Sequence, residues 1–230
     1  MSYYVGAYWG DRAESVTACA QCLADCLDRL AKTHVLLSTW YRKGRSKAAA
    51  SRQQVDVSPA ALESLLDSGR SRTDVGGEVI TELGFSASLW NKNADDVSFS
   101  ILCGATPGTS SIKNNFLLKL PTPSEVSAEV YDPAIAHRIL MSVVEVWQPQ
   151  WATFTSHALR EQQNAEANRP VAGWQTFVAT STKPGVPSGV HVEDVSNGIL
   201  LTAGPDPLHV SESQISAAAK YLENISQREV

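Results

Sequence analysis

The stretch from Ser2 to Lys47 constrains the fold most, because it places a strongly amphipathic segment between two aromatic ones. Residues 2–9 are crowded with aromatic and β-branched side chains, which favour a strand. Residues 13–32 carry apolar side chains in one narrow stripe at a helical turn of about 100° per residue, which predicts a helix with a buried side. The stripe consists of Val16, Ala20, Leu23, Leu27 and Leu30. Residues 34–41 return to strand-like composition, so the stretch predicts a strand, helix, strand unit whose two strands join one sheet.

The rest of the chain repeats both kinds of segment. Two further helices are predicted at residues 133–147 and 211–226, and a shorter one begins at Pro59 with Ser58 as its cap. Strands are predicted at residues 84–90, 97–103, 116–120, 173–179, 189–194 and 198–202, with Asn197-Gly198 as a tight turn. Residues 151–155 fit either a strand or a turn.

This mixture of helices and antiparallel hairpins lacks the regular alternation of strands and helices that is typical of a parallel α/β fold. We therefore expect an α+β fold, with a mainly antiparallel sheet covered by the amphipathic helices at residues 13–32 and 133–147. With 230 residues, of which 43% are hydrophobic, the chain can bury a substantial core. A single domain over residues 1–230 is the expected organisation.

The net charge of the chain limits its expected partners, and its hydropathy limits its expected location. The net charge is −5, which disfavours general affinity for nucleic acid and favours a basic partner. No apolar run reaches the roughly 20 residues of a membrane helix, and no basic lead precedes an apolar N-terminal core. We expect a cytoplasmic protein that does not contact a membrane.

Three cysteines, Cys19, Cys22 and Cys26, lie within the first predicted helix. On a regular helix they line one flank beside Leu23 and Leu27, where cysteine commonly serves as a small core residue. A tetrahedral metal site would need further ligands from distant segments, so we expect a structural role, no metal and no cofactor. Cys22 is the most outward of the three thiols.

Motifs of catalysis are missing from the sequence, and one weak constellation remains as an alternative. His191, Glu193 and Asp194 could place a base beside carboxylates, although in a strand Asp194 would point away from the other two. Pro205-Asp206 with Glu212 is similar to the start of a metal-dependent nuclease signature, but Gln214 stands two positions after Glu212, where that signature needs a lysine. We expect no enzymatic activity, with a hydrolase as the less favoured alternative.

A basic aromatic segment from Trp40 to Lys47 supports a second alternative. It combines aromatic rings with cations, as in modules that bind single-stranded nucleic acid by stacking and phosphate contact. The candidate residues are Trp40, Tyr41, Arg42, Lys43 and Arg45. The opposing interpretation is a buried Trp40 beside a solvated cationic loop, which the acidic chain as a whole favours.

Several long stretches of the chain carry a resemblance to a known family. They are SYYVGAYWGDRAESVTACAQCLADCL, LLSTWYRKGRSKAAA, GGEVITELGFSASLWN and RPVAGWQTFVA. Together they resemble the immunity protein 52 family of bacterial polymorphic toxin systems, over nearly the whole chain. The resemblance implies a small cytoplasmic α+β protein that binds and blocks a secreted toxin encoded beside it. The toxins of such systems are typically restriction-endonuclease-like nucleases, some delivered by type VI secretion, and the immunity proteins have no catalytic residues.

An inhibitor of a nuclease can occupy the cationic surface that the enzyme offers to phosphates, by presenting carboxylates in their place. Acidic residues expected on loops and strand ends are therefore candidate toxin contacts, with an aromatic residue as an anchor. The candidate toxin-binding residues are Trp90, Asp95, Asp96, Glu193, Asp194 and Asp206.

Overall fold

The computed structural model describes residues 2–42, 54–92, 97–108, 114–163 and 169–228. Its contacts group the chain into two compact units. The terminal unit comprises residues Met1–Ala7 and Leu120–Val230, and the middle unit comprises Tyr8–Lys119. Strands pair antiparallel in both units and helices pack beside them, so the predicted α+β class is confirmed. The single domain over residues 1–230 stays a prediction.

The strands of the middle unit follow one another in the order β2-β3-β4-β5, and neighbours pair antiparallel. They are β2 (Tyr41–Arg42), β3 (Phe85–Trp90), β4 (Ser98–Cys103) and β5 (Asn114–Lys119). Leu89 lies opposite Phe99, and Ile101 lies opposite Phe116, so one face of this sheet is buried. The other face is half-exposed and carries Ser100 and Leu102. The strands predicted at residues 84–90, 97–103 and 116–120 are therefore confirmed as an antiparallel meander with one buried face.

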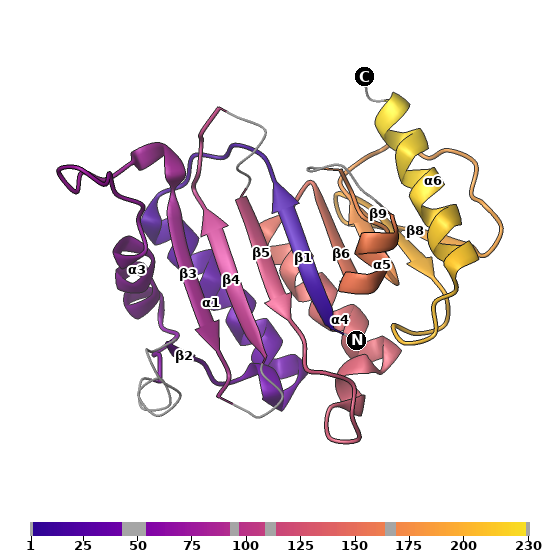
Figure 1. The fold of residues 1–230 in the computed structure, drawn as a ribbon, viewed down its shortest axis with the longest axis horizontal. Coiled ribbons are helices and arrows are strands. Elements are labelled where there is room, and N and C mark those ends of the chain that lie inside the picture. Colours follow the sequence, from indigo (N-terminus) through magenta and orange to yellow (C-terminus); the bar gives the residue numbers. More distant parts are fainter. Residues whose placement is uncertain (1, 43–53, 93–96, 109–113, 164–168, 229–230) are drawn as a thin grey trace. The chain divides into compact units, whose positions relative to one another are not determined.

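Helix α1 (Val16–Thr33) covers the buried face of this sheet, behind the strands in Figure 1. Its N-cap is Ser15, whose hydroxyl oxygen accepts the backbone N–H of Ala18 at 3.1 Å. Leu23 and Leu27 are fully buried, which confirms the predicted stripe. The shorter helix α3 (Pro59–Ser68) packs against α1 and β3, and the 3₁₀ helix η2 (Thr81–Leu83) precedes β3.

The predicted strand at residues 34–41 is wrong. Val35–Leu37 form a 3₁₀ helix, η1, and His34 caps it by accepting the backbone N–H of Leu36 at its Nδ1, 3.2 Å away. Only the last residue of the predicted range, Tyr41, enters a strand. Trp40 packs edge-on against Phe99, with ring centroids 4.8 Å apart. Leu37 and Trp40 are buried whereas Val35 is exposed, so the apolar composition of this segment did not indicate an extended backbone.

In the terminal unit the strand order is β1-β6-β7-β9-β8, so β8 is the edge strand. The strands are β1 (Tyr3–Trp9, which ends in the middle unit), β6 (Trp151–Ser156), β7 (Gln175–Val178), β8 (Val190–Val195) and β9 (Gly198–Ala203). The pairs β6–β7, β7–β9 and β8–β9 are antiparallel. The three late strands were predicted correctly, and residues 151–155 prove to be a strand.

Every residue of β6 and β7 is buried, so both faces of this second sheet are covered. Figure 1 shows α4 (Pro133–Trp147) behind the strands and α5 (His157–Gln162) in front of them. The 3₁₀ helix η3 (Ala128–Tyr131) leads into α4, whose N-cap Asp132 accepts the N–H groups of Ala134 and Ile135. The last helix, α6 (Glu212–Arg228), packs on β8 and β9. The helices predicted at residues 133–147 and 211–226 are confirmed.

Candidate interaction surfaces

The hairpin of β8 and β9 holds two of the candidate contact residues. Val195 lies opposite Gly198, so Ser196 and Asn197 alone form the turn. Asn197 has a φ of 68°, a left-handed conformation that asparagine tolerates and that suits such short turns. The predicted turn is therefore present, one residue earlier than Asn197-Gly198.

Strand alternation separates the polar residues of β8 onto two sides. His191 and Glu193 share one side, and Asp194 shares the other with Val190 and Val192. Asp194 forms an ion pair with Lys183. Burial raises the pKa of Tyr221 on α6, and the positive charge of Lys183 partly offsets this increase. The side of β8 that carries Asp194 also carries the buried Val190. Glu193 is exposed and forms no ion pair within the described part of the chain.

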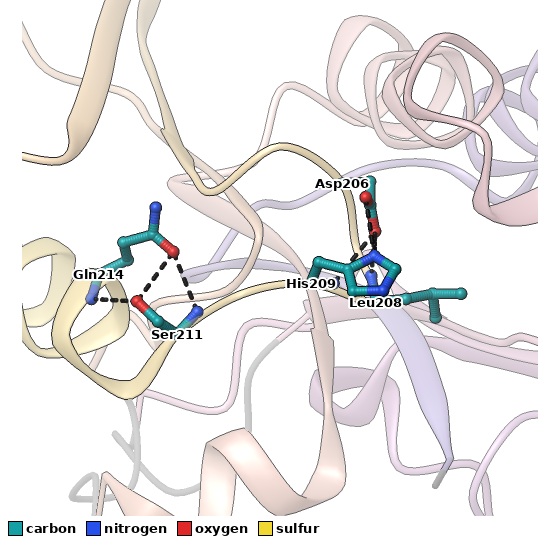
Figure 2. A network of polar contacts seen from close by, with 5 residues as sticks. All are labelled: Asp206, Leu208, His209, Ser211 and Gln214. Carbon is teal, nitrogen blue, oxygen red and sulfur yellow. Dashed lines mark hydrogen bonds and ion pairs between the residues drawn. The ribbon is translucent and has the colours of Figure 1, made fainter.

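Asp206 lies in the loop between β9 and α6, where it organises the backbone (Figure 2). Its Oδ1 accepts the backbone N–H of Leu208 at 2.9 Å and that of His209 at 3.0 Å. Both carboxylate oxygens lie 2.9 Å from Nδ1 of His209. Burial raises the pKa of Tyr3, and the negative charge of Asp206 raises it further. Asp206 therefore shapes the loop as well as contributing charge to it.

A capping box fixes the start of α6 beside this loop (Figure 2). The hydroxyl of Ser211 accepts the backbone N–H of Gln214 at 3.3 Å, and Oε1 of Gln214 accepts the backbone N–H of Ser211 at 3.0 Å. The helix predicted at residues 211–226 begins at this capping box, which the S-x-x-Q spacing of Ser211 and Gln214 could have revealed.

The two units differ in charge. The terminal unit contains 12 Asp and Glu residues against 6 Lys and Arg, whereas the middle unit contains 12 against 13. The whole acidic excess of the chain therefore belongs to the unit that holds Glu193, Asp194 and Asp206. A surface with such an excess attracts cationic partners over distances of about one Debye length.

Trp90, the candidate anchor, lies at the end of β3 in the middle unit. It pairs with Tyr41 across the sheet, and its Nε1–H donates to the backbone oxygen of Arg42 at 3.2 Å. The ammonium of Lys92 lies 5.2 Å from the ring centre of Tyr41. Trp90 is half-exposed, so one part of its ring remains available to a partner. The other candidates of this hairpin, Asp95 and Asp96, lie outside the described residues.

The nucleic-acid alternative loses its main stacking group in this structure. Trp40 is only 1% exposed, so it cannot stack on a base. Tyr41 is half-buried and Arg42 is exposed, while Lys43 and Arg45 lie outside the described residues.

The hydrolase alternative is not assembled into a site. His191 and Glu193 point to one side of β8, whereas Asp194 points to the other and pairs with Lys183. Over the described ranges, no group of three or more His, Cys, Asp or Glu side chains is placed to hold a metal ion.

Three of the cysteines lie on α1, and one of them, Cys19, contacts Cys103 on β4. Cys19 and Cys26 are fully buried, and Cys22 is the most outward, as expected from the helical spacing. A hydrogen bond with Cys19, together with burial, raises the pKa of Cys103 far above the ordinary thiol value. Burial also raises the pKa of Cys22. A raised pKa keeps the thiols of Cys22 and Cys103 protonated at neutral pH.

No helix among the described residues is both long enough and apolar enough to cross a membrane.

Comparisons with known proteins agree with this fold. A family model described as Immunity protein 52 matches residues 1–228. A solved structure described as the Pseudomonas aeruginosa T6SS protein PA0821 superposes with a TM-score of 0.57 at 12% sequence identity. The match covers 97% of this chain and 76% of that chain. No curated protein sequence matches the chain significantly.

Proposed function

The chain belongs to the immunity protein 52 family, and from this premise we propose that it binds a secreted nuclease toxin and neutralises it. Membership in an immunity family implies a cognate toxin as the partner and suggests a binding protein rather than an enzyme. The proposed toxin is restriction-endonuclease-like, and its proposed route of delivery is type VI or related secretion. The T6SS protein PA0821, whose fold is similar, supports that route.

The distribution of charge carries the nuclease part of the proposal. A nuclease must present cationic groups to the phosphates of its substrate. The terminal unit has an excess of carboxylates, which can take the place of those phosphates. Glu193 and Asp194 are exposed carboxylates of the edge hairpin, and the half-buried Asp206 adds charge on the same unit. Complementary charge of this kind chiefly raises the association rate and selects the partner.

The middle unit contributes the remaining proposed contacts. Trp90 is a half-exposed aromatic ring of the kind that anchors protein interfaces. Asp95 and Asp96 follow it closely in sequence and are proposed as a second acidic group.

Charge reversal tests this proposal. We expect the double variant Glu193→Lys, Asp194→Lys to associate about tenfold more slowly than the parent with the toxin domain encoded beside this chain, measured by surface plasmon resonance at low salt. Raising the salt concentration should narrow the difference, because salt screens exposed charges. The pair Asp95→Lys, Asp96→Lys examines the other acidic group in the same assay.

The matched control is Glu161→Lys, Glu223→Lys, which changes the net charge equally at exposed positions on α5 and α6. We expect it to slow association much less, since local charge steers more strongly than the total. Thermal unfolding should show that all variants fold. An association rate of both hairpin variants within about threefold of the parent at low salt would place the toxin elsewhere.

A further inference from the structure

The edge strand β8 leaves backbone groups unpaired on its outer side. In an antiparallel hairpin closed by a two-residue turn, the pair that flanks the turn exchanges hydrogen bonds, and pairs alternate from there. Val195 flanks the turn, so Glu193 and His191 also bond to β9. The N–H and C=O groups of Val192 and Asp194 therefore point away from the sheet.

Two observations support this assignment. The N–H of Val190, which has the same orientation, donates outward to the oxygen of Pro187 at 3.4 Å. Within the residues that the structure describes, the outward groups of Val192 and Asp194 make no backbone hydrogen bond to another segment. An open edge of this kind is a template for a further strand.

The side chains of β8 restrict which strand can add. A second copy of this chain, pairing edge to edge in the antiparallel register centred on Glu193, would place the Glu193 carboxylates of the two copies opposite one another. Like charges directly opposite one another destabilise a strand pair, whereas opposite charges stabilise it. The edge therefore disfavours self-association and suits a strand that carries lysine or arginine.

We propose that β8 binds an extended, cationic segment of the toxin by adding it as a further strand of the terminal unit's sheet. The main chain of the segment bonds to the N–H and C=O groups of Val192 and Asp194. A cationic side chain of the segment pairs with Glu193 on one side, and another competes with Lys183 for Asp194 on the other. This inference rests on the proposed function and specifies how the toxin is held.

A proline in β8 tests the strand addition. Val192→Pro removes an outward N–H while leaving the bonds of His191 and Glu193 to β9, and proline is tolerated at sheet edges. We expect Val192→Pro to bind the adjacent toxin domain about tenfold more weakly, because a backbone acceptor of the toxin loses its donor. Val192→Ala is the matched control, since it loses the side chain but keeps the N–H, and it should bind within about twofold of the parent.

Hydrogen exchange gives an independent readout on the parent protein. Binding of the toxin domain should slow exchange at the amides of Val192 and Asp194, whereas a contact through side chains alone would leave them exchanging freely. This measurement decides the matter even if Val192→Pro fails to fold.

Each other outcome overturns the inference in a recognisable way. Parent-like affinity of a folded Val192→Pro, or unprotected amides in the complex, excludes strand addition while leaving the proposed function intact. A homodimer that Val192→Pro dissociates would show that a second copy occupies the edge. If the parent does not bind the toxin domain at all, the proposed function fails together with this inference.

Discussion

Single side chains decide how much each candidate residue can offer a partner. The sequence identified Glu193, Asp194 and Asp206 as acidic residues near turns, but it could not show what they contact. Asp194 forms an ion pair with Lys183 in the segment before β8, and Asp206 accepts hydrogen bonds from the backbone two and three residues further on. The ion pair depends on how the loop before β8 packs against that strand, which the local pattern does not encode, whereas the Asp206 contacts are of the kind that aspartate makes in turns.

Cysteine spacing was more informative, because three cysteines on one helix have a fixed angular relation. The structure confirms that Cys22 is the outermost, and its pKa is raised above 9.0 by burial. A thiol is a nucleophile only as the thiolate, so a raised pKa keeps Cys22 largely unreactive at neutral pH.

We expect Ellman's reagent to modify Cys22 slowly and the three buried thiols only after unfolding. Below the pKa of Cys22, its rate should rise about tenfold per pH unit, following the thiolate fraction. Cys22→Ser should abolish the reaction in the native state. Rapid modification of two or more thiols at pH 7 would contradict the burial of Cys19, Cys26 and Cys103.

Elements with a strong period were predictable, and elements defined by a local turn were not. The apolar stripe of α1 and the alternation of β4 each admit one regular structure. The segment from His34 to Tyr41 has no such period, and the side-chain cap of His34 made a 3₁₀ turn there. The local sequence of β8 also does not show that it is an edge strand, because its composition does not reveal which strands pair with it.

The capping box of α6 should stabilise that helix measurably. We expect Ser211→Ala to lower the free energy of unfolding by about 1 kcal/mol, because the N–H of Gln214 loses its acceptor. Ser216→Ala, at an exposed position within α6, is the control and should have little effect. Urea titrations followed by circular dichroism give both values, and equal effects would mean that the cap contributes nothing.

The whole molecule raises a question that neither composition nor periodicity answers. A chain of 230 residues fits one large domain or two small ones, and the contacts form two units that share strand β1. The prediction of one domain therefore concerns cooperativity, which is an energetic property and must be measured.

Leu23→Asp offers that measurement. Leu23 is fully buried in the middle unit, and an unpaired buried charge costs several kcal/mol, so the variant should unfold this unit. If the chain is one domain, amide protection should also disappear from α4 in the terminal unit. Ala18→Asp places the same charge on an exposed site of α1 and should leave the thermal midpoint near that of the parent. Retained protection in α4 would mean two domains, and an unchanged midpoint for Leu23→Asp would rule out this core.

The placement of Glu193 and Asp194 on an outer strand has a consequence for how such a protein diversifies. Their side chains lie outside the packed interior, so replacing them should alter stability by only about 0.5 kcal/mol. The backbone of β8 would keep the ability to hold a strand while its side chains change the choice of strand. A lineage that acquires a different toxin could thus change its binding specificity by a few substitutions on β8, while the rest of the fold stays unchanged.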